Sequence, residues 1–298
     1  MFGKAILIHN GSAGQAETGT RLGAVIGPLA AGIGELTLVQ TKEPGDAERI
    51  CRERGEETDL VLVLGGDGTV HECVNGLAAL AAPPVVGILP GGTCNDFSRA
   101  LYIPQELDRA AETLMRGKTQ TVDIGRANDR YFSNFFGIGL ITDASVNINP
   151  QLKGMIGKLS YFISTLQTVT SADPFRFTLE HDSGQTGGEA VMLFVANGRF
   201  LGTRPLPLAP DALYDGVLDV AIIREAGLPL LKELFKIKNF EEWDSEKSSF
   251  EFIRTTSLKL TTDQPMQADM DGEIYARTPA EISVLGKKLT FLVGEEQP

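Results

Sequence analysis

The chain has 298 residues, 42% of them apolar and 22% charged, which is ordinary for a soluble globular protein of one large domain or two. Its formal net charge of −12 disfavours a nucleic-acid partner, because binding a phosphate backbone calls for a basic surface. No stretch approaches the roughly 20 apolar residues of a membrane span, residues 1–20 lack the features of a signal peptide, and three cysteines without metal-type spacing suit a reducing cytosol.

The first 122 residues alternate strand patterns with helical patterns. This alternation predicts βαβ units and a mostly parallel, doubly wound sheet in an N-terminal α/β domain over residues 1–122. The strands are expected at 4–9, 35–40, 60–64 and 85–89, and the helices at 15–31, 44–54, 70–80 and 105–116.

After Gly117 the pattern changes to short strands separated by Gly, Asn, Asp and Pro, which indicates an antiparallel, β-sandwich-like domain over residues 123–286. The apolar strand Leu289–Val293 of the tail 287–298 could return to either domain. Strands are expected at 120–127, 130–139, 175–182, 189–197, 217–224, 251–263, 267–277 and 281–285, with helices at about 152–170 and 228–240.

The most informative segment is a glycine-rich turn, GGDGT at residues 65–69, which directly follows the apolar run 60–64. Glycines let backbone N–H groups approach an anion closely. An acid inside such a phosphate cradle is electrostatically awkward unless a metal ion lies between acid and phosphate. The turn therefore indicates a nucleotide triphosphate site with Mg²⁺, although for this pentapeptide alone a strand–helix turn with Asp67 as N-cap is an equal alternative.

Two further turns follow predicted strands. In PGGTCNDF at residues 90–97, Thr93, Asn95 and Asp96 place a hydroxyl, an amide and a carboxylate where a helix would begin. Neighbouring turns at the carboxyl ends of strands are the expected place for a ligand crevice in an open α/β sheet. The first turn, residues 10–14, matches neither the Rossmann nor the Walker A spacing, which argues against a dehydrogenase or a P-loop enzyme.

With the late turn Asp271-Gly272-Glu273, these motifs resemble the diacylglycerol kinase catalytic-domain family, in its bacterial soluble lipid kinase branch. The likeness covers almost the whole chain and departs clearly only at the first turn, where family members often have Asn-Pro and this chain has Asn10-Gly11. The resemblance implies an NAD-kinase-like α/β domain followed by the β-sandwich-like domain, with the active site in the cleft between them. NAD kinases share the GGDGT turn and remain an alternative.

The resemblance also implies roles for individual residues. Asp67 and Asp96 are expected to hold the catalytic Mg²⁺. The general base is either Glu273 or Asp67, and the sequence does not decide between them. Lys158, with Lys153 an equal candidate, would screen phosphate charge. The expected nucleotide contacts are Asn10, Ser12, Gly14, Thr41, Gly65, Gly66, Asp67, Gly68, Thr69, Glu72, Thr93 and Asn95. A structural metal site is implied at Asp215, with backbone carbonyls near Ala212 and Val217; otherwise Asp215-Gly216 would be read as a hairpin turn.

We therefore predict an ATP- and Mg²⁺-dependent lipid kinase that phosphorylates the hydroxyl of a diacylglycerol-like lipid. We expect it to be cytoplasmic and peripherally associated with a membrane surface, and we leave open a homodimer. The segment 228–240 has an apolar face beside Lys232, Lys236 and Lys238, which suits membrane docking or ordinary packing on a sheet. An NAD kinase, or a nucleotide-binding regulator without turnover, remains the alternative.

Overall fold

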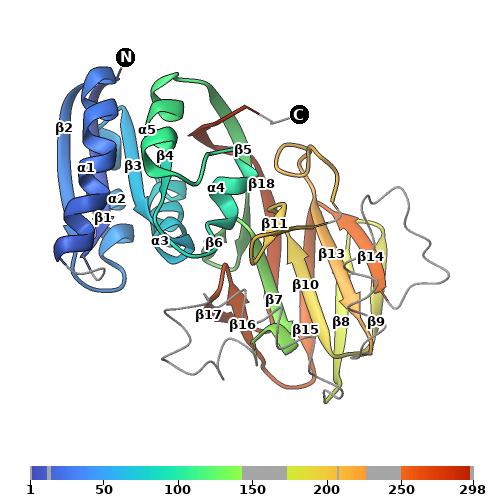
Figure 1. Ribbon diagram of the computed structural model, residues 1–298. Helices are drawn as coiled ribbons and strands as arrows, with labels where there is room; N and C mark the ends of the chain where they lie inside the picture. Colours follow the sequence, from blue (N-terminus) through green and yellow to red (C-terminus); the bar gives the residue numbers. More distant parts are fainter. Residues whose placement is uncertain (1, 12–14, 143–172, 207, 226–249, 296–298) are drawn as a thin grey trace. The chain divides into compact units, whose positions relative to one another are not determined.

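The computed structural model describes residues 2–11, 15–142, 173–206, 208–225 and 250–295 (Figure 1). The chain forms two compact units, one of residues 1–122 with 287–298 and the other of residues 123–286. The helices expected at about 152–170 and 228–240 lie outside the described residues. No helix within the described part of the chain is sufficiently long and apolar to span a membrane.

A parallel sheet with the strand order β2-β1-β3-β4 is the centre of the first unit. Every residue of β3 is buried, as expected for a parallel strand covered on both faces. The order reverses between β1 and β3, which makes the carboxyl ends of these strands the switch point where ligands bind in doubly wound sheets. The strands are β1 (Phe2–Asn10), β2 (Ile33–Thr41), β3 (Leu60–Gly65) and β4 (Val85–Pro90).

Two pairs of helices cover the opposite faces of this sheet (Figure 1). Helix α1 packs against α5 and α2 against α3, as right-handed crossovers require for this strand order. The helices are α1 (Gln15–Gly32), α2 (Asp46–Arg54), α3 (Asp67–Ala78), α4 (Asp96–Ala100) and α5 (Leu107–Met115), with a 3₁₀ turn η2 (Gly55–Glu57) after α2. The prediction for α3 starts three residues too late, because Asp67 already belongs to the helix.

The second unit is a β-sandwich. Its first layer is an antiparallel sheet ordered β14-β13-β10-β7-β16-β17, and the strands of the second are ordered β18-β15-β8-β9. Side chains from both layers form one apolar core, with Phe136, Leu193 and Val220 from the first and Leu179 and Leu260 from the second. The first layer comprises β7 (Phe135–Gly139), β10 (Met192–Ala196), β13 (Leu218–Ile223), β14 (Phe250–Thr255), β16 (Gln267–Met270) and β17 (Glu273–Arg277). The second comprises β8 (Phe175–His181), β9 (Gly184–Ala190), β15 (Ser257–Thr262) and β18 (Ala280–Leu292).

Strand β18 continues into the first unit from Lys287, and there Phe291 pairs in parallel with Val86 of β4. Strand β5 (Thr119–Ala127) pairs with β18 and with β6 (Arg130–Phe132), and β11 (Phe200–Leu201) with β12 (Arg204–Pro205) forms a small ribbon. The fold class predicted from the sequence, an α/β domain followed by an antiparallel β-sandwich-like domain, is confirmed.

Several predicted strand boundaries are wrong. The segments 130–139 and 251–263 are each two strands, and 267–277 is a hairpin of β16 and β17. The segments 281–285 and 289–293 are instead parts of the single strand β18. Two of these breaks coincide with turns whose backbone N–H groups donate to distant aspartates. Asn134, before β7, donates to Asp271, and Thr256, before β15, donates to Asp182. A local pattern does not contain this information.

Candidate active site

Two glycine-rich turns meet at the carboxyl ends of β3 and β4. The N–H of Gly91 donates to the carbonyl of Gly65 over 2.9 Å. A Cβ added to Gly92 would lie only 2.5 Å from the Cα of Gly66, so these backbones pack with no room for a side chain. The two turns predicted from the sequence therefore form one continuous backbone surface, and glycine is what permits the contact.

Asp67 joins the two turns. One carboxylate oxygen accepts the N–H of Asn95 over 2.9 Å and the other accepts the N–H of Asp96 over 2.8 Å. Asp67 thereby satisfies N–H groups at the start of α4, a helix that follows the next strand of the sheet. Helix α3, which Asp67 begins, has no side-chain cap. A carboxylate oxygen can accept more than one contact, so these two hydrogen bonds do not by themselves prevent Asp67 from binding a cation.

The side chain of Asn95 fixes the second turn from within. Its Oδ1 accepts the N–H of Gly92 over 2.8 Å, and its Nδ2 donates to the Gly92 carbonyl over 3.0 Å. Asn95 has a left-handed φ of 53°, which an asparagine tolerates better than most residues. Gln105 supports it: its Oε1 accepts from Asn95 Nδ2, and its Nε2 donates to Ser98 Oγ and to the Ile103 carbonyl. Gln105 is not predictable from the sequence, because no local motif marks it.

The other predicted residues of the first unit lie around these turns. Thr69 packs over Gly65, Thr93 is exposed on the second turn, and Asp96 is fully buried. Asn10 and Thr41 are paired in register at the carboxyl ends of β1 and β2.

Thr41 and Glu72 also have structural contacts. Thr41 Oγ1 donates to the His9 carbonyl over 3.4 Å, and Glu72 accepts the N–H of Ala47 at the start of α2 over 3.1 Å. Their roles as nucleotide contacts stay predictions. Ser12, Gly14, Lys158 and Lys153 lie outside the described residues.

In the second unit, Glu273 is the first residue of β17 and pairs with Met270 across the hairpin. The two turn residues, Asp271 and Gly272, have φ values of 55° and 93°, as in a type I′ hairpin turn. The buried carboxylate of Asp271 accepts the N–H groups of Ser133, Asn134 and Phe135 over 2.8–3.0 Å. This anchoring fixes the backbone that carries Glu273.

The predicted structural metal site lies among acidic side chains. Asp215 accepts the N–H of Val217 over 3.1 Å, and Asp123, fully buried, accepts the N–H of Gly216 over 2.7 Å. Arg254 forms ion pairs with both Asp215 and Asp219. Burial raises the pKa of Asp215 and raises that of Asp219 to about 6, against the opposing effect of Arg254.

The Arg254 guanidinium therefore pairs with two carboxylates beside this loop. Carboxylate and carbonyl oxygens suit a hard divalent cation. Across the described residues, no group of three or more His, Cys, Asp and Glu side chains is arranged to hold a metal ion. The predicted site would use one carboxylate and main-chain carbonyls near Ala212 and Val217, so this finding leaves it a prediction.

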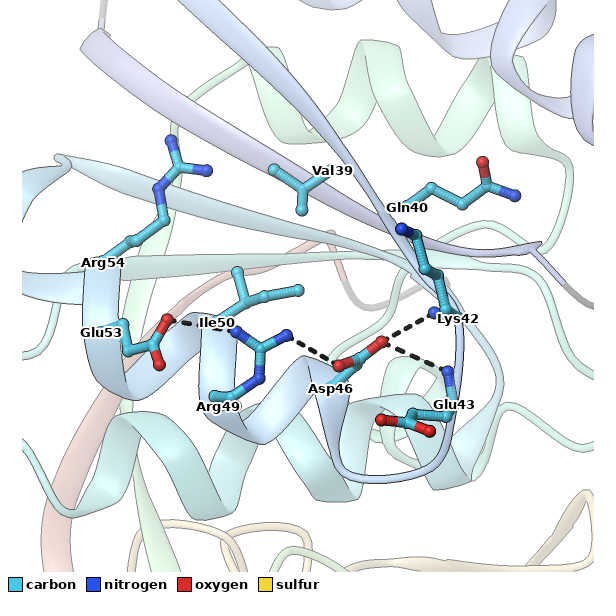
Figure 2. Close-up of a pocket in the computed structure, with 9 residues that line it drawn as sticks. All are labelled: Val39, Gln40, Lys42, Glu43, Asp46, Arg49, Ile50, Glu53 and Arg54. Atoms are coloured by element: carbon cyan, nitrogen blue, oxygen red, sulfur yellow. Dashed lines mark hydrogen bonds and ion pairs between the residues drawn. The ribbon is translucent and has the colours of Figure 1, made fainter.

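A pocket of about 490 Å³ lies between the end of β2 and helix α2 (Figure 2). Its central carboxylate, Asp46, accepts the N–H groups of Lys42 and Glu43 and an N–H of Arg49. The Arg49 hydrogen bond and then these backbone donors lower the pKa of Asp46 to about 2. Arg49 also pairs with Glu53, so charges largely neutralise one another here. None of the predicted site residues lines this pocket.

Comparisons with known proteins agree with this architecture. The family model "Diacylglycerol kinase catalytic domain" matches residues 4–127, and the model "YegS C-terminal NAD kinase beta sandwich-like domain" matches residues 137–293. A Staphylococcus carnosus (strain TM300) protein named "Putative lipid kinase" is 33% identical over 296 residues, 98% of this chain and 97% of that protein. A Staphylococcus aureus (strain JH9) protein with the same designation is 32% identical, covering 96% of each. A crystal structure of a Bacillus anthracis str. Sterne diacylglycerol kinase matches with a TM-score of 0.87 at 37% identity, covering 98% of each chain.

Proposed function

Since this chain belongs to the diacylglycerol kinase catalytic-domain family of lipid kinases, we propose that it transfers the γ-phosphoryl group of ATP to the hydroxyl of a diacylglycerol-like lipid. One observation carries the proposal for this chain. The Asp67 carboxylate joins two glycine-rich turns at the carboxyl ends of adjacent parallel strands, which places an acid at the position where ligands bind in such sheets.

Phosphoryl transfer depends on positioning and on electrostatic stabilisation of the phosphates. For the phosphate chain, the turn at Gly65–Gly68 would contribute backbone N–H groups and Thr93 a hydroxyl, since the N–H groups of Gly91 and Gly92 already donate to Gly65 and Asn95. Asp67 and Asp96 are the proposed Mg²⁺ ligands; when bound, Mg²⁺ neutralises charge on the phosphates. Mg²⁺ usually takes only one or two carboxylates together with phosphate oxygens and water, and of these two acids Asp67 is partly exposed and Asp96 is fully buried. The structural cation proposed at Asp215 is a separate site.

The lipid hydroxyl must lose its proton, and we assign the general base to Glu273. Glu273 is a half-buried carboxylate on a hairpin whose backbone Asp271 anchors, and Asp67 is the acid that joins the two turns, where we propose that it holds Mg²⁺. Glu273→Gln should then remove turnover and leave ATP affinity unchanged. If this variant turned over at the wild-type rate, Glu273 would not be the general base, and Asp67 would be the remaining candidate.

The direct test uses ATP labelled in the γ-phosphate with a panel of lipid alcohols in mixed micelles, and NAD as a further acceptor. The proposal expects label in diacylglycerol or a close analogue, dependent on Mg²⁺. Label in NAD alone would make the protein an NAD kinase. Binding of ATP without transfer to any acceptor would make it a nucleotide-binding regulator.

A lipid substrate also requires contact with a membrane, and we propose peripheral association. The basic residues Lys232, Lys236 and Lys238 beside an apolar stripe carry this proposal from the sequence, and they lie outside the described residues. Each lysine near an anionic surface contributes about 1 kcal/mol, so a triple Lys→Glu variant should lose binding in vesicle co-sedimentation. Unchanged vesicle binding would refute this role for the segment.

A further inference from the structure

Arg21 of helix α1 lies at the place where the two glycine-rich turns meet. Its Nη1 donates to the carbonyl of Gly91 over 2.7 Å, in a partly buried hydrogen bond. Gly91 is the residue whose N–H donates to Gly65, so the guanidinium contacts the junction of the turns itself. No sequence motif marks Arg21, which lies within the helix after the first turn.

The ion-pair partner of Arg21 is exposed. Its Nη2 contacts Glu17 one helical turn earlier, and the side chains of Arg21 and Glu17 are 31% and 55% exposed. An exposed i,i+4 pair of this kind is weak, so a ligand with more negative charge can replace Glu17. A guanidinium carries five N–H donors, so it can donate to a further acceptor besides these two.

We propose that Arg21 binds the phosphate chain of the nucleotide, exchanging Glu17 for a phosphate oxygen while it keeps the Gly91 carbonyl. This inference rests on the proposed function of the turns as the ATP site. The planar guanidinium fork matches phosphate oxygens, and charge-assisted hydrogen bonds are the strong ones. A chain with a net charge of −12 repels a triphosphate, so a cation held at the turns supplies a local attraction.

The competing role for Arg21 is purely structural, as a donor that holds the Gly91 carbonyl. Substitutions separate the two roles. Arg21→Gln keeps a neutral donor for the carbonyl and loses the charge, Arg21→Lys keeps the charge and loses the fork, and Arg21→Met loses both. Arg109→Met, an exposed arginine on α5, makes the same change of net charge away from the turns.

The experiment is calorimetric titration of each folded variant with Mg·ATP, ADP and AMP. Arg21→Met and Arg21→Gln should both weaken ATP binding about 10- to 100-fold, as expected for the loss of charge-assisted bonds. Arg21→Lys should be intermediate, Arg109→Met close to the wild type, and the loss should be smaller for AMP than for ATP. If Arg21→Met does not fold, Arg21→Gln and Arg21→Lys decide the question.

Two results would overturn the inference while the proposed function stands. The first is wild-type affinity for ATP in Arg21→Gln, and the second is an equal loss for ATP and AMP, since either marks a structural role. Failure of the wild-type protein itself to bind ATP would instead count against the proposed function.

Discussion

At Asp67 and Asp271, a carboxylate accepts backbone N–H groups from a turn that is remote in the sequence. Asp67 accepts the N–H groups of the residues 28 and 29 positions later in the chain. Asp271 accepts the N–H groups of residues 133–135, which lie more than 130 positions earlier. In both cases the acid belongs to a motif seen in the sequence, but its partners do not follow from the motif. The motifs therefore mark these acids as candidate site residues, and only the structure shows which backbone groups they contact.

Substitution of Asp271 should destabilise the second unit. Asp271→Asn keeps a residue that tolerates the positive φ, but it replaces an acceptor oxygen with an NH₂ group that faces backbone donors. Since bonds to a charged group contribute about 1.5–3 kcal/mol each, the free energy of unfolding should fall by about 2 kcal/mol or more. Urea denaturation measures this change.

Asp263→Asn provides the control for Asp271, because Asp263 is exposed and its substitution should change the free energy of unfolding by about 0.5 kcal/mol or less. Equal unfolding curves for the Asp271 variant and the wild type would show that these hydrogen bonds do not anchor the hairpin.

At the scale of elements, long apolar strands were predictable and short breaks were not. The buried runs of β3 and β4 lie where the sequence predicts them, within one residue, because an uninterrupted apolar segment has few alternatives. Strand β9, with three glycines among seven residues, has no apolar pattern and was missed; it is defined by pairing with β8. The break between β14 and β15 depends on Asp182, which is about 75 residues away.

Asp182 should give the sandwich a pH-dependent stability. Its carboxylate accepts the N–H and the hydroxyl of Thr256, and these bonds lower its pKa from 3.8 to about 2. A folded-state pKa below the unfolded value stabilises the protein above about pH 4, and the contribution is lost as the pH falls through 2. Asp182→Asn should thus be less stable than the wild type at neutral pH, with a difference that shrinks between pH 4 and pH 2.

Urea midpoints of both proteins across this range measure the effect, because other titrating groups cancel in the comparison. A difference that is constant with pH would mean that the Asp182 charge contributes nothing.

At the scale of the whole molecule, the change of pattern after Gly117 was sufficient to predict the fold class. Alternating strands and helices specify a parallel sheet, and successive short strands specify antiparallel layers. The path of the C-terminal segment was not predictable in detail. Lys287 has a φ of 52°, and the polar stretch around it interrupts the apolar pattern of β18 without ending the strand.

The acidic loop around Asp215 should respond to divalent cations. If a metal ion binds there, Mg²⁺ should raise the melting temperature of the wild type and a chelator should lower it, because a ligand of the native state stabilises it by mass action. Asp215→Asn should lose this response. Asp215→Asn also loses the ion pair with Arg254, whether or not a metal ion is present. The effect of the metal ion is therefore measured as the difference in melting temperature with and without Mg²⁺, determined separately for each protein. A melting temperature of the wild type that is indifferent to Mg²⁺ and chelator would refute the structural metal site.

We propose that Asp67, by joining the two glycine-rich turns, forms the site of phosphoryl transfer. The most direct measurement is the initial rate of γ-phosphate transfer from ATP to dispersed diacylglycerol by the wild type, Asp67→Asn and the exposed control Asp108→Asn, each shown to be folded by thermal melting. Asp67→Asn should lose at least about 100-fold in rate, while Asp108→Asn should keep the wild-type rate. A wild-type rate in folded Asp67→Asn would contradict this proposal.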